Sequence, residues 1–386
     1  TVNGAGATNT ITTTTTPPSL AVTGTGVPGD TVAVTVGNQT QTTTVGADGN
    51  WSTSFSGTTL PADGTHTASA VFSGNGSMQT IPGPGFVIDM TPPPLGVSDG
   101  VQSTGDVENL AEYADGITLT GTSEPGARVA VTIGTVTHPA TVAADGTWTV
   151  TFTPAQVAGG ERTETVTLRA TDALGNVTTR TETLVLDTVP PPLGLNQVTG
   201  DNLINRSESQ SSIVIGGTAT ANTTVTLTIE GMPGPTTVNV DSNGNWSHGL
   251  SRGVFAEGTY TRQITATTQD AAGNPTTVTR TLNIDTQMAV DFGAGAIAGD
   301  NVVNLAESNG SIALSGTVAR DATRVEVQWL GQPIPATINT DGTWSLTLPA
   351  GAAGSISRDS TITVTAWDAA GNSQQATRHL RIDLET

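Results

Sequence analysis

The sequence predicts an all-β fold, in which a string of small β-sandwich domains forms an elongated rod. The first observation behind this prediction is a period. Four tryptophans close an Asp/Asn-Gly-x-Trp turn and stand 97, 98 and 98 residues apart, at Trp51, Trp148, Trp246 and Trp344. Such a period is too long for a solenoid repeat, and it matches a small domain with its own core. The chain therefore contains four copies of one module, repeats 1 to 4.

The second observation is the strand pattern inside a repeat. In repeat 3, Val225, Leu227 and Ile229 alternate with threonines, as expected for a strand with one buried face. No segment has the spacing of an amphipathic helix of useful length. Gly, Pro, Asn and Asp clusters separate the runs, so seven strands are expected, at 193–198, 212–220, 223–230, 235–240, 245–251, 259–268 and 276–284.

The third observation is the size of this strand set, which is that of an immunoglobulin-like two-sheet sandwich. The chain has no cysteine, so the disulfide of antibody domains is absent. The Trp of each turn is expected in the core, because such a hairpin lets the next side chain pack inward; a sugar-stacking platform is the alternative. The prediction is therefore four tandem immunoglobulin-like β-sandwich domains.

The linkers divide the chain. Each repeat ends in an apolar strand followed by an aspartate, at 98-residue intervals: Asp89, Asp187, Asp285 and Asp383. Two linkers continue into a triple proline, which stiffens an extended connection, whereas the third reads Thr-Gln-Met-Ala and is expected to bend more easily. The expected domains are 1–89, which is divergent, 90–187, 188–285 and 286–386.

The charge of the chain limits its partners. All 13 basic residues are Arg, against 33 Asp plus Glu, and the formal net charge is -20. Such a chain repels nucleic acid and anionic lipid, and it has no run of about 20 apolar residues for direct membrane insertion. A cation is the complementary partner. No initiator Met or secretory signal is visible, so the sequence reads as a piece of a longer chain.

Oxygen-bearing side chains recur at three places in the repeat: the linker, a turn that reads Asp-Ala-Leu/Ala-Gly-Asn, and a Gly-Asp loop before the second strand. The linker set is Asp89, Asp187 and Asp285, and the turn set is Asp172, Asp270 and Asp368. The loop set is Asp106, Asn109 and Glu112 in repeat 2, Asp201, Asn202, Asn205 and Glu208 in repeat 3, and Asp300, Asn301, Asn304 and Glu307 in repeat 4.

These donors favour a hard cation over zinc or copper, because cysteine is absent and the four histidines are scattered. Calcium is expected, since it accepts six to eight oxygens in irregular geometry. In an immunoglobulin-like sandwich the last hairpin lies where the chain enters the domain, so linker and turn aspartates should meet. The expected pairs are 83 residues apart: Asp89 with Asp172, Asp187 with Asp270, and Asp285 with Asp368.

The same turn also has a purely structural interpretation, because Asp and Asn bond their own backbone in a stable hairpin. Repeat 1 lacks both the turn and the loop, and it shows Ser73-Gly74-Asn75 where the aspartate is expected. The sequence therefore leaves open whether repeat 1 has a calcium site of its own. An enzyme is not expected either, because no His recurs at one repeat position to serve as a base.

Three motifs of repeat 2 resemble a known family. They begin at Gly121 (GTSEPGARVAVT), Ala144 (ADGTWTVTFTP) and Ala170 (ATDALGNVT, with LDTVPP after it). With their counterparts, they are similar over about residues 19–386 to the bacterial immunoglobulin-like repeats of giant type I secreted, biofilm-associated surface adhesins. The resemblance implies secretion to the bacterial cell surface and rigidification by calcium. By motif, the implied ligands include Asp187 with Asp270, and Asp201 with Glu208.

The predicted function is a calcium-stabilised extender that projects the terminal binding domains of an adhesin for cell adhesion or biofilm formation. Its partners are calcium ions and neighbouring repeats, with a glycan or partner-cell ligand elsewhere in the full protein. Two alternatives stay open. The repeats themselves bind a glycan or partner cell, for which Trp329 and Trp367 are the side chains to examine, or they are accessory domains of a secreted hydrolase.

Overall fold

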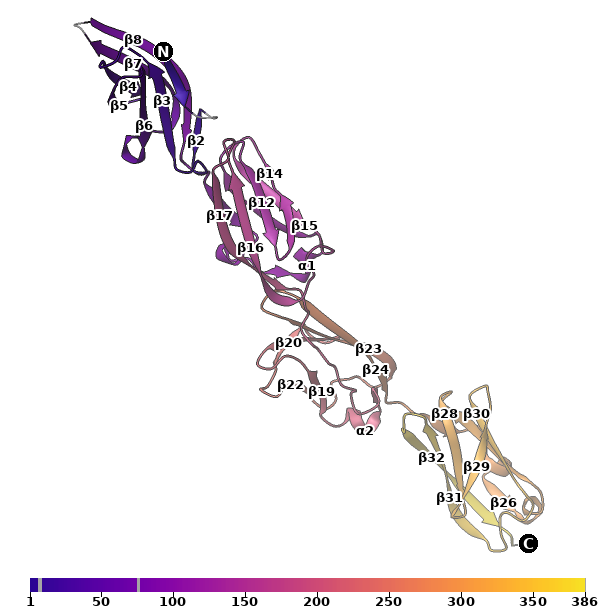
Figure 1. The fold of residues 1–386 in the computed structure, drawn as a ribbon. Helices are drawn as coiled ribbons and strands as arrows, with labels where there is room; N and C mark the ends of the chain where they lie inside the picture. Colours follow the sequence, from indigo (N-terminus) through magenta and orange to yellow (C-terminus); the bar gives the residue numbers. More distant parts are fainter. Residues whose placement is uncertain (6–8, 75–76, 386) are drawn as a thin grey trace. The chain divides into compact units, whose positions relative to one another are not determined.

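The computed structural model describes residues 1–5, 9–74 and 77–385. Its elements are strands joined by loops, and the α-helices of the described residues have four residues each (Figure 1). The chain forms two compact units, Thr1–Pro190 with Ala271–Asn274, and Pro191–Asp270 with Pro275–Thr386. The all-β prediction is confirmed. None of the helices in the described part of the chain is long and apolar enough to cross a membrane.

Repeat 1 has a three-stranded sheet, β1-β3-β6, and a five-stranded sheet, β2-β8-β7-β4-β5. Its pairings are antiparallel except that of β2 with β8, which is parallel. The elements are β1 (Val2–Ala5), β2 (Thr10–Thr12), β3 (Ser19–Thr25), β4 (Thr31–Val36), β5 (Gln39–Thr44), β6 (Asn50–Ser56), η1 (Gly57–Thr59), β7 (Gly64–Gly74) and β8 (Ser77–Asp89).

Repeat 2 has a five-stranded sheet, β10-β17-β16-β12-β13, and a four-stranded sheet, β14-β15-β11-β9. The short strand β10 again runs parallel to the last strand of the repeat. The elements are β9 (Leu95–Asp99), η2 (Gln102–Thr104), β10 (Glu108–Asn109), α1 (Leu110–Tyr113), β11 (Ile117–Ser123), β12 (Arg128–Ile133), β13 (Val136–Pro139), β14 (Thr141–Val142), β15 (Thr147–Phe152), β16 (Glu161–Thr171) and β17 (Val177–Asp187).

Repeat 3 has a five-stranded sheet, β18-β24-β23-β20-β21, and a two-stranded sheet, β19-β22. Six of the seven expected strands form. The first, at 193–198, forms no regular strand; it has an isolated bridge from Leu193 to Ala219 and backbone bonds from Gly194 and Asn196 to Thr218 and Gly216. The elements are β18 (Leu203–Ile204), α2 (Arg206–Ser209), β19 (Ile213–Thr218), β20 (Thr224–Ile229), β21 (Thr236–Asn239), β22 (Asn245–Leu250), β23 (Thr259–Gln269) and β24 (Pro275–Asp285).

In repeat 4 the two layers are joined, because one strand, β29, pairs with both β28 and β30. The order is β25-β27-β30-β29-β28-β31-β32-β26. The elements are β25 (Val290–Phe292), η3 (Ile297–Gly299), β26 (Val302–Asn304), α3 (Leu305–Ser308), β27 (Ile312–Val318), β28 (Ala322–Trp329), β29 (Gln332–Ile338), β30 (Thr343–Leu348), β31 (Arg358–Asp368) and β32 (Ser373–Asp383).

Each repeat has its own hydrophobic cluster, and each cluster contains the periodic tryptophan. These tryptophans are at most 4% exposed, so their prediction as core residues is confirmed. A glycine pairs with each of them on the neighbouring strand, as Gly217 on β19 does with Trp246 on β22. A backbone carbonyl oxygen on one side and the indole on the other fill the space that a Cβ on this glycine would need.

Substituting this glycine is expected to destabilise the repeat. A Cβ at Gly217 would lie 1.9 Å from the Gly194 carbonyl oxygen and 3.0 Å from the Trp246 ring. Gly217→Ala should therefore lower the free energy of unfolding of repeat 3 by about 1–3 kcal/mol, the usual cost of overpacking. Gly249→Ala on β22 is the control, because its Cβ would meet nothing within 4 Å. Denaturant unfolding compares the two variants, and equal stabilities would contradict the packing explanation.

Candidate functional site

The Gly-Asp loop and the linker meet at one end of each sandwich. In repeat 2, Asn109 is paired with the linker residue Asp187 across β10 and β17. In repeat 4, Asn304 is paired in the same way with Asp383. In repeat 3, β18 and β24 pair in parallel up to Ile204 and Ile284, which directly precede Asn205 and Asp285. The loop therefore lies at the end where the chain leaves the repeat.

The asparagine and glutamate of each loop form a capping box around a short helix. The Oδ1 atoms of Asn109, Asn205 and Asn304 accept bonds from the backbone N–H groups of Glu112, Glu208 and Glu307. In return, one oxygen of each glutamate accepts the N–H of its asparagine, at 3.2, 3.0 and 3.0 Å. These predicted metal ligands thus have a structural role, which is to satisfy the first N–H groups of the helix.

The other loop residues bond locally as well. Asn202 and Asn301 have φ values of 66° and 67°, and their Oδ1 atoms accept N–H groups at 3.0 and 2.9 Å. Asp201 and Asp300 each accept the N–H two residues later, at 2.9 Å. In repeat 2, burial raises the pKa of Asp106, and repulsion by Asp99 and Glu112 adds to the effect.

The turn aspartates organise the hairpin that carries them. Asp172 accepts the N–H groups of Leu174, Gly175 and Asn176 at 2.8, 2.6 and 2.9 Å. Burial opposes its charge, but these bonds and the Asn176 side chain outweigh burial and lower the pKa of Asp172. Asp368 accepts the N–H of Asn372 at 2.8 Å in the corresponding turn. The hairpin interpretation of this motif is therefore confirmed, and it leaves metal binding open because a carboxylate has further lone pairs.

The asparagine that ends the turn joins the turn to the preceding linker. Asn176 Nδ2 donates to the Asp172 carboxylate at 2.7 Å and to the Asp89 carbonyl at 3.0 Å. Asn372 Nδ2 donates to Asp368 at 2.8 Å and to the Asp285 carbonyl at 2.7 Å. This bridge brings two of the three predicted aspartate pairs to one place. Asp187 and Asp270 belong to different units, and their pairing stays a prediction.

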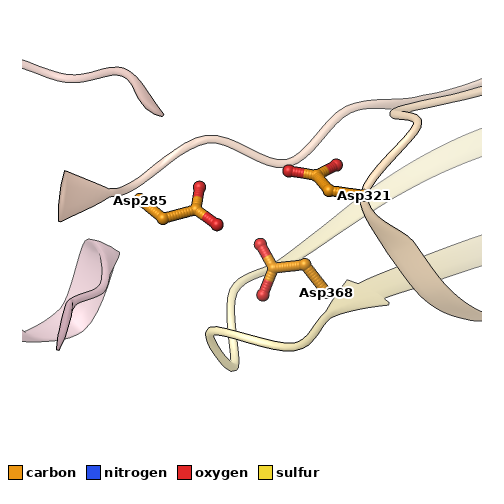
Figure 2. Close-up of side chains that lie close together, drawn as sticks. All are labelled: Asp285, Asp321 and Asp368. Carbon is orange, nitrogen blue, oxygen red and sulfur yellow. The ribbon is translucent and has the colours of Figure 1, made fainter. Parts of the chain in front are cut away.

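The linker after repeat 3 completes a cluster of three carboxylates, Asp285, Asp321 and Asp368. One oxygen of each lies within 4.8 Å of the others, and Figure 2 shows the side chains pointing toward one another. Asp285 comes from the end of β24, Asp321 from the turn before β28, and Asp368 from the end of β31. Burial raises the pKa of Asp285, and the charges of Asp368 and Asp321 raise it further against a bond from Thr259.

Asp321 was missed in the sequence. The corresponding turn of repeat 2 carries Glu124, which lies three residues after Gly121, whereas Asp321 lies five residues after the corresponding Gly316. Burial raises the pKa of Glu124, with repulsion from Asp172 and Asp89 as further causes. Both residues lie in the turn after the Gly-Thr pair, in GTSEPG and GTVARD. An acidic residue at this turn in two repeats is the signal that could have identified them. The same turn of repeat 3 reads GTATAN and has no carboxylate.

The donor set of the cluster suits one class of ion. It contains only carboxylate oxygens, and Asp368 is 6% exposed. Three carboxylates offer up to six oxygens, and neither Cys nor His joins them, which fits Ca²⁺ better than zinc or copper. These residues therefore fit a calcium ion, which would also cancel their mutual repulsion.

The two tryptophans of the glycan hypothesis differ in exposure. Trp329 is 4% exposed, and its Nε1 donates to the Ala352 carbonyl at 2.7 Å, so it is a core residue. Trp367 is half-buried, and the guanidinium carbon of Arg324 lies 4.2 Å from its ring centroid. Arg324 thus covers one face of this ring, the surface on which a sugar would stack.

Comparison with known proteins identifies three of the repeats. A bacterial Ig domain model matches residues 105–187, and a bacterial Ig-like domain model matches 196–286 and 287–384. No relative is found among curated proteins.

Among solved structures, the chain is similar to a "Ca2+-stabilized adhesin" that "helps an Antarctic bacterium reach out and bind ice". The identity is 29% over 100% of this chain and 99% of that one, with a TM-score of 0.38. It is similar to a tetra-tandem repeat in the extending region of a large adhesion protein. The identity is 23% over 100% of this chain and 99% of that one, with a TM-score of 0.40. It is also similar to a bacterial immunoglobulin-like domain of the M. primoryensis ice-binding adhesin. The identity is 34% over 24% of this chain and 95% of that one, with a TM-score of 0.19. The family-model matches cover more than two thirds of the sequence, and the chain belongs to the bacterial immunoglobulin-like domain family.

Proposed function

We propose that this chain is a calcium-stabilised extender segment of a bacterial cell-surface adhesin, with domains 1–89, 90–187, 188–285 and 286–386. The observation that carries the proposal is the cluster of Asp285, Asp321 and Asp368 between the sheets of repeats 3 and 4. Carboxylates at this spacing repel one another. A divalent cation bound by all three removes the repulsion and ties the end of one repeat to the next.

The geometry of two joints supports the ligands proposed there, and the ligands of the third come from the sequence pattern. Asp285, Asp321 and Asp368 hold the ion after repeat 3, and Asp89, Glu124 and Asp172 hold the ion after repeat 1. For the joint after repeat 2 the proposal keeps Asp187 and Asp270. The loop residues form a second set of donors in the proposal, because strand pairing places them at the linker end of each repeat: Asp106, Asn109, Glu112, Asp201, Asn202, Asn205, Glu208, Asp300, Asn301, Asn304 and Glu307.

The charge of the chain supports an ion-dependent extender. With 33 acidic and 13 basic residues, the chain repels itself where calcium is scarce. Outside the cell, where calcium is plentiful, binding to the folded joints shifts the equilibrium toward them. Secretion by a type I system to the cell surface, and a spacer role for cell adhesion or biofilm formation, belong to this proposal. The family of the repeats supports a structural role over an enzymatic one.

Calcium is expected to raise the stability of the chain. An ion that binds only the folded state adds about 2.7 kcal/mol at 100 times its Kd, for each site. Calorimetric melting in CaCl₂ and in excess EDTA, with isothermal titration to count the ions, tests the proposal. A melting temperature that is the same in both buffers, with no heat of binding, would contradict it. MgCl₂ is the control, since its small ion requires an octahedral geometry that three irregular carboxylates do not provide.

A further inference from the structure

One contact recurs at the three joints and uses no ion. It is made by the asparagine that ends each turn: Asn176, Asn274 and Asn372. These side chains are 0%, 1% and 4% exposed. Each Nδ2 donates to the backbone carbonyl of the linker aspartate that precedes its own repeat, at 3.0, 2.8 and 2.7 Å. The contact therefore spans the boundary between two repeats.

The Oδ1 atom of the same asparagine reaches further into the preceding repeat. It accepts the backbone N–H of Thr13, Leu110 or Arg206, at 2.8, 2.7 and 2.7 Å. In the first two joints the N–H belongs to the residue after the one paired with the linker aspartate. The Nδ2 donor and the Oδ1 acceptor of one amide thus both bind to the same edge of the preceding repeat, where its short strand lies beside its last strand.

The upstream partners that all three amides share are main-chain groups, although the Thr13 hydroxyl also donates to Asn176 Oδ1 at 2.7 Å and Asp187 Oδ1 also accepts from Asn274 Nδ2 at 3.4 Å. Thr13, Leu110 and Arg206 have unrelated side chains, and repeat 1 forms the contact although it lacks the Gly-Asp-Asn loop of repeats 3 and 4. The downstream partner is specific, because the two ends of the Asn amide donate to the linker carbonyl and accept the upstream N–H at the same time, on separate atoms. Any repeat whose short strand pairs with its last strand offers the same backbone carbonyl and the same backbone N–H. The next repeat must supply the asparagine.

We infer that the turn asparagine is a latch that joins consecutive repeats without a metal ion and accepts any repeat of this family upstream. The latch holds the linker carbonyl and the upstream N–H at fixed positions, and it thereby brings the carboxylates of the joint together before an ion binds. A buried amide that lost these partners would leave polar groups unsatisfied, which keeps the joint closed. This inference does not depend on the proposed calcium role.

The joint after repeat 3 allows a test from the upstream side. Arg206→Pro removes the N–H that Asn372 accepts, and proline is well tolerated as the first residue of a helix. Asn205, the residue before it, has φ -86° and ψ 178°, which a following proline permits. Arg206→Ala is the matched control, because it removes the same side chain and keeps the N–H.

The readout is the distance between spin labels on the two repeats, measured in the full chain. The sequence has no cysteine, so Thr261→Cys and Thr361→Cys, both exposed, carry the only labels. In excess EDTA we expect a broader distance distribution for Arg206→Pro than for Arg206→Ala. Equal distributions for these two variants would overturn the latch.

A second variant tests the downstream side. Asn372→Ala should broaden the distance distribution as Arg206→Pro does. The double variant should be little broader than either single variant, because both substitutions remove the same contact. Asn339→Ala is its control, since Asn339 Nδ2 donates to the Thr343 hydroxyl within its own turn, at 2.9 Å. If Asn372→Ala matches Asn339→Ala, the latch is wrong. The calcium role alone would be rejected if EDTA left the distance distribution of the unsubstituted chain unchanged while Arg206→Pro broadened it.

Discussion

Replacing Glu108 with isoleucine is expected to stabilise repeat 2 above pH 7 by on the order of 3 kcal/mol. Glu108 is 5% exposed, and its Oε1 atom is buried without a hydrogen-bond partner among the described residues. It pairs with Leu186, the residue before the linker aspartate. The residues at this place in the other repeats are Ile11, Ile204 and Val303, all core residues.

The expected gain depends on pH. Burial, with repulsion by Asp106, Glu112 and Asp115, raises the pKa of Glu108 from 4.5 to about 7. Below pH 4.5 the carboxyl is protonated in both the folded and the unfolded state, and its ionisation contributes nothing. Between pH 4.5 and about 7 the unfolded state loses its proton first, so the stability of repeat 2 falls as the pH rises. Above about 7 the penalty is constant, and the substitution removes all of it.

Hydrogen exchange of the repeat 2 strands, in EDTA at pH 5, 6 and 8, measures this effect. Glu108→Gln is the control, because it removes the titration and keeps a polar side chain of the same shape. Both variants should lose the pH dependence, and only isoleucine should also gain from burying apolar surface. A gain for Glu108→Ile that is the same at all three pH values would show that ionisation has no part in it.

The effect of Asp285→Asn on the stability of the joint is expected to be opposite in EDTA and in calcium. In EDTA the substitution removes one of three clustered charges and should stabilise the joint by about 1 kcal/mol. In calcium it removes a proposed ligand, so that the linkage stabilisation of about 2.7 kcal/mol at 100 times Kd should be largely lost. The backbone carbonyl of Asp285, which Asn372 uses, is unchanged. The latch should therefore persist in both buffers.

Melting curves followed by tryptophan fluorescence in both buffers test this prediction, since the half-buried Trp367 adjoins Asp368. Asp359→Asn is the control, because Asp359 is exposed and faces His379 on the same sheet. It should have little effect in either buffer. If Asp285→Asn destabilises the chain equally in EDTA and in calcium, the cluster does not bind the ion.

The fold could be predicted from the sequence because its signals are local. The alternation at Val225, Leu227 and Ile229 places these side chains in the core of repeat 3, where each is at most 6% exposed. The Asp/Asn-Gly turns likewise place the four tryptophans. The segment 193–198 enters from a linker and reaches β19 with the bridge at Leu193 and with backbone bonds from Gly194 and Asn196, too few for a regular strand.

The site was less predictable, because its partners are distant in the chain. The pairing of Asn109 with Asp187 across parallel strands decides where the loop lies, and no local pattern contains it. The capping boxes of Glu112, Glu208 and Glu307 show that a spacing read as metal ligation also serves a helix terminus. Asp321 entered the cluster only through the turn that precedes β28.

The sequence by itself determined the period, the strand class, the buried tryptophans and the acidic character of the linkers, because these depend on side chains at fixed local spacing. The tertiary structure alone decided which oxygens share a joint. Asp285, Asp321 and Asp368 meet because three strand ends converge there. Asn372 bridges two repeats because its amide faces main-chain groups 87 and 166 residues away. Contacts of that range follow from strand register and from the packing of one repeat on the next, and the residues themselves do not specify them.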